Sequence, residues 1–443
     1  MFTRKQVWTL IIPLMIEQVL TSLMGTVDTM MVSNAGEAAV SAVSLVDTLN
    51  ILLIYLFSAM ATGGAIICAQ YLGRKEKAEA NETGRQLMLT VGAISVALML
   101  VCALLRGPLL RLIFGEVEAE VMKNARNYLL ITALSYPFIA LYNAGAALFR
   151  VDGNSRLPMA ISLSSNIINI AGNAVLIFGF KLGVVGAASA TLAAHAYCTV
   201  MIFIFLRQPR QAIVIRDYRR LRPRWDRIRS IMFIGLPTGI ENGMFQVGKL
   251  AIQSTVSTLG TTAIAAHAMT SALEGFLSHA QVGIGLGLMT IVGQCMGAGR
   301  VDEARKYILR LTGYCEIVTI VMCGVVAALA QPIALLAGLE AESARLMKEM
   351  VYALCIFKPL TWTLSFIPAY GFRAAGDVRF PMIVSTITMF GCRVVTAIAL
   401  MRFFGFGPIA VWIGMFVDWG VRGIVFSWRF FSMRWAEKKV IQG

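Results

Sequence analysis

The stretch IIPLMIEQVLTSLMGTVDTMMVSNAG, residues 11–36, decides the fold. It is apolar and longer than the roughly 20 helical residues that cross a bilayer. It nevertheless contains Glu17 and Asp28, and a charged side chain in the hydrocarbon region is costly and usually marks function. The two acids are 11 residues apart, close to three helical turns, so we expect them on one face of a membrane helix. Pro13 removes a backbone N–H one turn before Glu17 and predicts a bend there.

The composition of the whole chain is that of a polytopic membrane protein. Its 443 residues are 58% hydrophobic and 14% charged, whereas a soluble domain is typically about 25% charged. The net charge of +15 is typical of basic cytoplasmic loops that face anionic headgroups, so we expect a lipid bilayer and no nucleic acid as partner. The eight cysteines form no CxxC pair, which indicates neither a disulfide framework nor a metal site.

Hydropathy and loop residues together predict an all-α protein with twelve membrane spans. The predicted spans are residues 7–33, 40–70, 86–113, 124–149, 157–180, 184–206, 230–257, 262–296, 307–331, 346–372, 380–404 and 408–430. Lys and Arg concentrate in the two termini and in alternate loops. By the positive-inside rule we expect a multi-pass protein of the plasma (inner) membrane with both termini in the cytoplasm.

The opening stretch recurs in the second half of the chain. Its proline, its glutamate and its last glycine are repeated 224 residues later, at Pro237, Glu241 and Gly260. A second block, FRVDGNSRLPM at 149–159, matches FRAAGDVRFPM at 372–382 at an offset of 223. Each copy holds six spans, and because six is even the copies share one orientation in the membrane. This predicts a parallel internal repeat, an arrangement found in some transporters.

The repeat also predicts the domain organisation. We expect a first lobe of six spans at 1–206, a cytoplasmic linker at 207–229 and a second lobe of six spans at 230–443. The linker, RQPRQAIVIRDYRRLRPRWDRIR, carries nine arginines against two aspartates, which is typical of a segment on an anionic membrane surface. Each chain contains both lobes, so we expect it to function as a monomer.

Several segments resemble the multidrug and toxic compound extrusion (MATE) family of cation-coupled antiporters. They are VDTMMVSNAG at 27–36, NIINIAGNAVLIFGF at 166–180, GVVGAASAT at 183–191, IVGQCMGAGR at 291–300 and GFRAAGDVRFPM at 371–382. The resemblance implies two six-helix lobes around a cavity that opens to one side of the membrane at a time. It also implies export of small amphipathic, cationic organic compounds driven by Na⁺ or H⁺, with no cofactor and no enzymatic activity.

The residues themselves suggest an ion site in the first lobe. The repeat partner of Asp28 is Ile252, so the fold does not require this acid. Asn169 and Asn173 are one helical turn apart, and Thr191 ends the GAASAT run. Carboxylate, amide and hydroxyl oxygens suit a small hard cation, but an apolar lobe also favours a protonated carboxyl, so H⁺ stays open. The resemblance places the family's first-lobe ion site at these four positions, although some members have an acid where this chain has Asn173. The alternatives are structural hydrogen bonding for the asparagines and a structural buried acid for Asp28.

Three further acids and one proline are candidates for secondary roles. Glu17 and Glu241 are repeat mates, which favours a shared structural role over a substrate role. Glu274, in the eighth predicted span, could attract a cationic substrate, and Lys249 could be the counter-ion of Glu241 or of Glu274. Pro13 resembles the family's first-helix proline, where bending has been proposed to accompany ion binding. Its repeat mate Pro237 favours the alternative that the kink serves packing.

Other function classes make different demands on the sequence. A lipid-linked precursor flippase of the same superfamily should have a strongly cationic cavity and often extra spans. A membrane-embedded transferase should have acids or histidines clustered in interfacial loops, where this chain has basic residues and glycine. An ATP-driven pump would need a GxxxxGK[ST] phosphate loop, which the sequence lacks.

Overall fold

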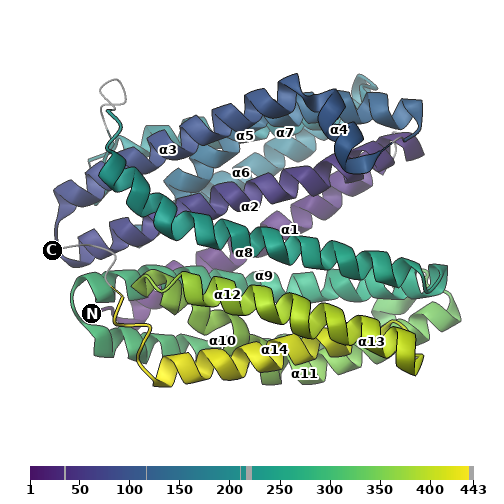
Figure 1. Cartoon of the computed structure of the whole chain (residues 1–443). Coiled ribbons are helices and arrows are strands. Elements are labelled where there is room, and N and C mark those ends of the chain that lie inside the picture. Colours follow the sequence, from purple (N-terminus) through teal and green to yellow (C-terminus); the bar gives the residue numbers. More distant parts are fainter. Residues whose placement is uncertain (34–35, 116, 210, 216–221, 439–443) are drawn as a thin grey trace. The chain divides into compact units, whose positions relative to one another are not determined.

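The structure is a computed structural model that describes residues 1–33, 36–115, 117–209, 211–215 and 222–438, without the side chains of residues 23, 24, 26 and 29. Within these residues the chain forms α-helices and two π-helical segments (Figure 1). In chain order they are α1 (Arg4–Ser33), α2 (Glu37–Gly73), α3 (Lys77–Leu104), α4 (Arg106–Phe114), α5 (Ala119–Val151), α6 (Arg156–Asn173), η1 (Ala174–Gly179), α7 (Gly183–Leu206), α8 (Trp225–Ser257), α9 (Thr261–Gly297), α10 (Val301–Leu336), α11 (Ala341–Ala375), α12 (Arg379–Ile387), η2 (Thr388–Val394), α13 (Val395–Phe404) and α14 (Ile409–Phe431).

In the described part of the chain these elements form twelve helical segments of membrane length, here called rods. Helices α3 and α4 count as one rod, α6 and η1 as another, and α12, η2 and α13 together as a third. Ten rods are long and apolar enough to cross a membrane. The remaining two are α1 and α8, which carry Pro13 with Glu17 and Pro237 with Glu241. The predicted all-α fold with twelve helices is confirmed.

The third predicted span differs from the structure. The sequence predicts one helix over 86–113, whereas α3 begins at Lys77 and ends at Leu104, and the separate helix α4 follows from Arg106. The early start is physically reasonable, because the polar residues from Lys77 onward are mostly helix formers that continue the rod beyond the apolar core. The corresponding helix of the second half, α10, runs unbroken.

The break between α3 and α4 coincides with a one-residue difference between the halves. Ala80 and Ala304 match at an offset of 224. Gly115 and Gly338, which follow α4 and α10 with φ angles of 69° and 63°, are 223 residues apart. The first half therefore has one residue more than the second half in the segment that contains the break.

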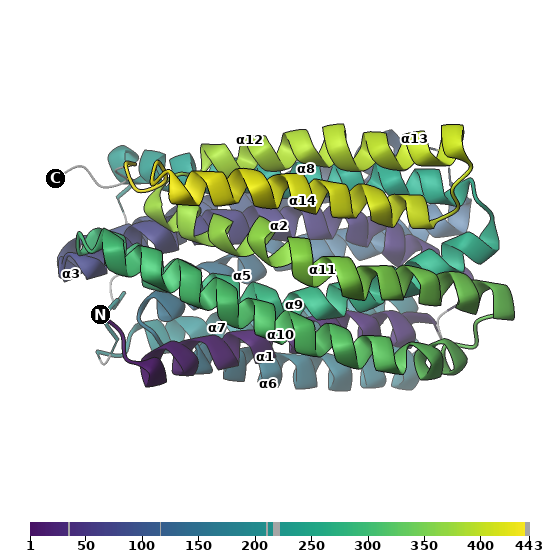
Figure 2. The ribbon, with the colours of Figure 1, turned by 90° about the horizontal axis from the view of Figure 1, so that it is seen from below.

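The chain divides into two compact units, Thr3–Gly239 and Ile240–Gly443 with Met1–Phe2. In the first unit α5 packs against α2, α3 and α7, and α6 packs against α7 and α1 (Figure 1). In the second unit α11 packs against α9, α10 and α14 (Figure 2). α5 and α11 are repeat equivalents, so each unit is built around the same helix. The predicted lobes and linker stay a prediction.

The same backbone turns recur in the two halves of the chain. Gly36 and Gly260 precede α2 and α9 with φ angles of 101° and 91°. Gly153 and Gly376 follow α5 and α11 with φ angles of 83° and 98°. Side chains with a Cβ atom rarely adopt such angles, so glycine is required in both copies. The predicted internal repeat is confirmed at the level of the backbone.

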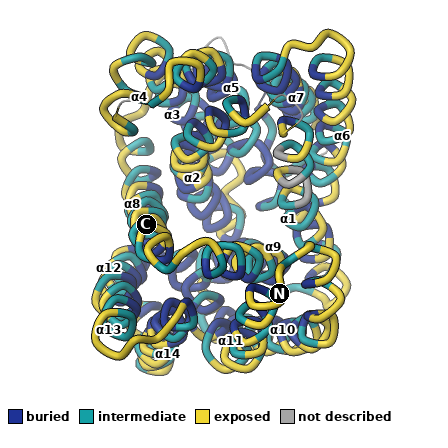
Figure 3. The backbone as a smooth tube through the Cα atoms, turned by 90° about the vertical axis from the view of Figure 1, so that its right-hand side faces the viewer, coloured by how far each residue is buried: buried dark blue, intermediate teal, exposed yellow. Residues whose placement is uncertain are grey.

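Burial follows the pattern expected of helices in lipid. The middle of α5 presents small side chains to its neighbours, and Ala133, Ala140 and Ala144 are fully buried. Outer turns of α6 are exposed (Figure 3), and the exposed apolar side chains of this helix include Leu163 and Ile167. Small residues let helices approach closely, and the apolar outer surface suits acyl chains.

Candidate ion site and intramembrane charges

The four predicted ion-site residues form one hydrogen-bonded chain in the first unit. Asn173 on α6 donates from Nδ2 to Oδ1 of Asp28 on α1 at 2.6 Å, and to Oδ1 of Asn169 at 3.1 Å. Asn169 donates from Nδ2 to Oγ1 of Thr191 on α7 at 3.2 Å. The Thr191 hydroxyl donates to the carbonyl oxygen of Ala187 at 3.0 Å. Side chains from three helices thus meet at the four positions that the family resemblance implies.

Close packing of α6 and α7 makes this chain possible. A Cβ atom added at Gly172 would lie 3.0 Å from the Cβ atom of Ala190, so only glycine allows the helices to approach at this level. The π-helical segment η1 begins directly after Asn173. Such segments are rare and are frequent at functional sites, because they interrupt the regular α-helical hydrogen bonding.

The site has unused oxygen ligands. Asn173 is 1% exposed, yet its Oδ1 atom has no hydrogen-bond partner in the described residues. A buried polar atom without a partner costs about 1–3 kcal/mol. Among the described residues, no Lys or Arg forms an ion pair with Asp28. The geometry therefore leaves a carboxylate and an amide oxygen available to a cation or a proton.

A second carboxylate, Asp47 on α2, belongs to a neighbouring network that we did not predict. Its Oδ1 atom accepts hydrogen bonds from Nδ2 of Asn50 at 3.1 Å and from the Tyr128 hydroxyl at 3.3 Å. Tyr136 donates its hydroxyl to Oδ1 of Asn50 at 2.7 Å. The signal was present in the sequence, because Asp47 is an acid inside the predicted span 40–70.

Glu17 and Glu241 each form an ion pair inside their own unit. Nη2 of Arg150 lies 2.8 Å from Oε1 of Glu17. Nη2 of Arg373 lies 2.8 Å from both carboxylate oxygens of Glu241. The two arginines are the second residues of the repeated FR blocks, so the repeat preserves the whole pair. This arrangement favours the structural role predicted for the two glutamates.

Glu274 has a counter-ion that the sequence did not reveal. Nζ of Lys358, on α11, lies 2.9 Å from Oε1 of Glu274 and 2.6 Å from Oγ of Ser278. Lys358 is fully buried, and its ammonium lies 4.9 Å from the ring centroid of Trp362. In the described residues Glu241 and Glu274 form their ion pairs with Arg373 and Lys358, and Lys249 forms no ion pair with either acid.

Lys249 and Arg393 instead face one aromatic ring. Nζ of Lys249 lies 5.2 Å and Cζ of Arg393 lies 5.5 Å from the ring centroid of Phe245. Arg393 lies in η2 and is 7% exposed. In the described part of the chain, neither cation has a hydrogen-bond or ion-pair partner. In the described residues, the second unit thus holds two cations that form no ion pair, whereas the first unit holds two carboxylates that form none.

Known proteins share both the repeat and the fold. The family model MatE matches residues 13–175 and again residues 237–399. The uncharacterized transporter YisQ of Bacillus subtilis is 27% identical over 440 residues, with 96% of this chain and 94% of that protein covered. The probable multidrug resistance protein NorM of Thermotoga maritima is 25% identical over 446 residues, with 99% and 94% covered.

Solved structures agree with the fold. The outward-facing conformation of a multidrug resistance MATE family transporter of the MOP superfamily superposes with a TM-score of 0.92 at 20% identity. The superposition covers 98% of this chain and 97% of the other. Because the MatE model matches most of the chain, once in each half and at the offset of the repeat, this multi-pass membrane protein belongs to the MatE family of transporters.

Proposed function

We propose that the chain is a secondary antiporter of the plasma membrane that exports small amphipathic, cationic organic compounds in exchange for Na⁺ or H⁺ by alternating access. Membership of a transporter family supports export. One observation carries the coupling site: Asp28 has no basic partner in the described residues, and it is bound to Asn173, whose Oδ1 atom has no partner. We further propose that both termini are cytoplasmic and that the monomer is the transport unit.

The two coupling ions would use the same residues in different ways. A sodium ion would take oxygen ligands from Asp28, Asn169, Asn173 and Thr191, a set that suits a hard cation. The side-chain amide of Asn173 presents its Nδ2 atom to the carboxylate of Asp28. Rotation of this amide by 180° would bring its Oδ1 atom, which has no hydrogen-bond partner in the described residues, to the position of Nδ2. A proton would bind to Asp28 itself and remove the charge that the lobe has to accommodate.

Pro13 is proposed as the hinge that links ion binding to helix movement. Proline cannot donate to the carbonyl oxygen four residues earlier, which belongs to Thr9. The hydroxyl of Ser155, directly before α6, donates to the carbonyl oxygens of Leu10 at 2.6 Å and of Thr9 at 3.3 Å. Helix α6 also carries Asn169 and Asn173. A shift of α6 on ion binding would therefore reach α1 next to Pro13, through the hydrogen bonds of Ser155.

A cationic substrate needs an acid that is free to bind it. Glu17, Glu241 and Glu274 already have an Arg or Lys partner, so a cationic substrate would have to displace that partner. Asp47 has no basic partner among the described residues. We therefore propose Asp47 as the first-unit acid for a substrate cation, with Glu274 as the second-unit candidate.

Dye extrusion from proteoliposomes tests the proposal. Wild type, Asp28→Asn and the surface control Asp302→Asn are compared under a sodium gradient and under a pH gradient. We expect the control to match wild type, Asp28→Asn to abolish extrusion, and the effective gradient to name the ion. Undiminished extrusion by Asp28→Asn would rule out the first-unit site, and wild type without extrusion under either gradient would rule out dye antiport.

The uncompensated pair Lys249 and Arg393 favours a second candidate function. Two cations beside Phe245 that form no ion pair in the described residues suit a substrate that carries an anionic group, and a lipid-linked precursor is of that class. The matched test is transport of an anionic and a cationic dye of similar size by wild type and by Lys249→Gln. Selective loss of anionic dye transport in Lys249→Gln would favour this candidate over cation export.

A further inference from the structure

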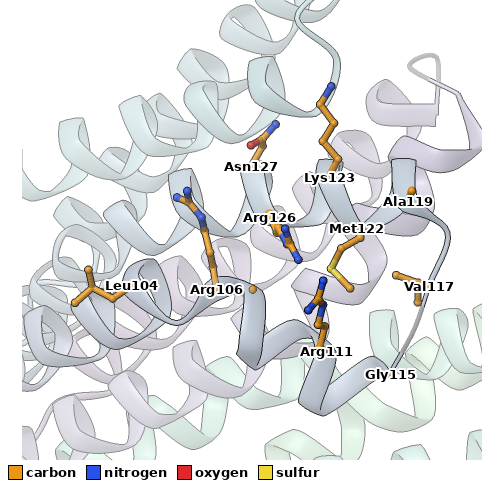
Figure 4. Close-up of a pocket in the computed structure, with 11 residues that line it drawn as sticks. Leu104, Arg106, Arg111, Gly115, Val117, Ala119, Met122, Lys123, Arg126 and Asn127 are labelled. Carbon is orange, nitrogen blue, oxygen red and sulfur yellow. The ribbon is translucent and has the colours of Figure 1, made fainter.

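A cavity of about 820 Å³ lies at the ends of α3 and α5, where the short helix α4 covers them (Figure 4). Its lining includes four basic side chains and the amide of one asparagine. They are Arg106, Arg111, Lys123, Arg126 and Asn127. The cavity lies wholly in the first unit and is separate from the ion site, so a ligand in this cavity is independent of the proposed transport function.

Two arginines of this cavity face each other. Arg111 on α4 and Arg126 on α5 point toward one another, whereas the side chains of Arg106 and Lys123 point away from this pair (Figure 4). Arg126 lies against the start of α4, because a Cβ atom at Gly107 would be 3.6 Å from its Cζ atom. Nε of Arg126 is buried and has no hydrogen-bond partner in the described residues.

No described acid neutralises this group of cations. Among the residues that the structure describes, none of the four basic side chains forms an ion pair or a side-chain hydrogen bond. Like charges that converge in a partly enclosed space repel one another. A bound anion would remove this repulsion and use the planar, two-pronged hydrogen-bonding edge of the guanidinium groups.

The fold does not require these cations. Because the repeat offset changes from 224 to 223 in this segment, both offsets are compared. With 223 the residues that correspond to Arg106, Arg111 and Lys123 are apolar, and with 224 the residues that correspond to the two arginines are also apolar. Arg126 corresponds to Glu349 or Met350. The second half folds in the same way without any of the four basic residues, and α4 exists only in the first half. The positive charge is therefore specific to this cavity.

The surroundings of the cavity indicate which anion it binds. Leu104 at the end of α3 is 77% exposed, and Leu112 and Ile113 on α4 are 84% and 48% exposed. A short helix with arginines on one side and exposed apolar side chains on the other is typical of the membrane interface. A free phosphate ion needs no apolar neighbours, whereas a phospholipid presents its phosphate and its acyl chains together.

We propose that this cavity is a binding site for the phosphate group of an anionic phospholipid, held by Arg111 and Arg126, with Arg106 elsewhere in the lining. The acyl chains would then lie along Leu104 and Leu112. In the proposed orientation this is the outer side of the membrane, where the positive-inside rule does not account for four basic residues. The site would hold α4 at the interface by a specific lipid.

The test uses the full chain purified in a neutral detergent. Its melting temperature is followed during titration with phosphatidylglycerol, with phosphatidylcholine and with inorganic phosphate. The double variant Arg111→Gln/Arg126→Gln is compared with wild type and with Arg402→Gln. Arg402 is an exposed arginine at the end of α13, and Arg402→Gln removes a charge at a helix end outside the cavity.

We expect phosphatidylglycerol to stabilise wild type and Arg402→Gln alike, and phosphatidylcholine and inorganic phosphate to have little effect. Removing two of the arginines should weaken the apparent phosphatidylglycerol affinity roughly thirtyfold, since each basic residue near an anionic lipid contributes about a factor of five. Equal lipid affinity of wild type and the double variant would overturn the proposal. Stabilisation by inorganic phosphate at the same concentrations would also overturn it, in favour of a free-anion site.

A double variant that melts like wild type without lipid shows that folding is intact. If it does not, Arg111→Lys, which retains the charge, is the second variant, and we expect it to keep most of the affinity.

Discussion

Arg150 binds Glu17 across 133 residues of sequence, with Nη2 of the arginine 2.8 Å from Oε1 of the acid. The second unit repeats this pair in Arg373 and Glu241. In each unit the pair joins a proline-containing helix to the end of the central helix, α5 or α11. The pair thus belongs to the architecture that both halves share.

Removing one partner of this pair should destabilise the protein. Glu17→Gln leaves Arg150, whose side chain is 18% exposed, without its counter-ion, and we expect a loss of about 3 kcal/mol in the free energy of unfolding. The double variant Glu17→Gln/Arg150→Met should recover most of this loss. Thermal unfolding in detergent measures both. If Glu17→Gln melts like wild type but no longer transports dye, Glu17 has a transport role instead.

Lys358 and Lys249 should respond very differently to the same substitution. Lys358→Met leaves Glu274 uncompensated and removes a fully buried ammonium, so we expect a loss of about 3–5 kcal/mol. Lys249→Met removes a cation that has no ion pair in the described residues, and the change should be about 0.5 kcal/mol or less. Comparable melting temperatures for the two variants would contradict the assignment of Lys358 as the counter-ion.

Asn173→Asp should strengthen Na⁺ binding. A second carboxylate beside Asp28 adds charge to the proposed ligand set, and we expect the sodium concentration needed for half-maximal thermal stabilisation to fall about tenfold. Asn166→Asp introduces the same charge on α6, outside the hydrogen-bonded chain, and should leave sodium dependence unchanged. No difference between the two variants would argue against Asn173 as an ion ligand.

Gly172→Ala tests whether helix spacing controls the site. The added Cβ atom would meet Ala190 at 3.0 Å and force α6 away from α7, which should weaken the Asn169–Thr191 hydrogen bond and lower ion affinity severalfold. Gly179→Ala makes the same change where no atom lies within 4 Å, and it serves as the control. An unchanged ion response in Gly172→Ala would show that the site does not depend on this close approach.

The features that sequence could predict are those with a fixed period or a fixed offset. Apolar runs predict the twelve helices. Spacing by one helical turn places Asn169 and Asn173 on one face, and the repeat comparison singles out Asp28, because its repeat partner is not an acid. Pairings between distant helices carry no such signal, and Lys358 is 84 residues from Glu274. The break after Leu104 did have a signal in the sequence, because Arg106, Gly107 and Pro108 follow directly after Leu105 within the predicted span 86–113.

The extra residue between Ala80 and Gly115 also bears on how the two halves diverged. A substitution changes one side chain, whereas an insertion into a continuous helix turns everything beyond it by about 100°. The interruption at Leu105 absorbs that turn, because the offset of 223 found at Gly115 persists to the end of α5. The first half therefore has a surface of its own, while the core that both halves share keeps its register.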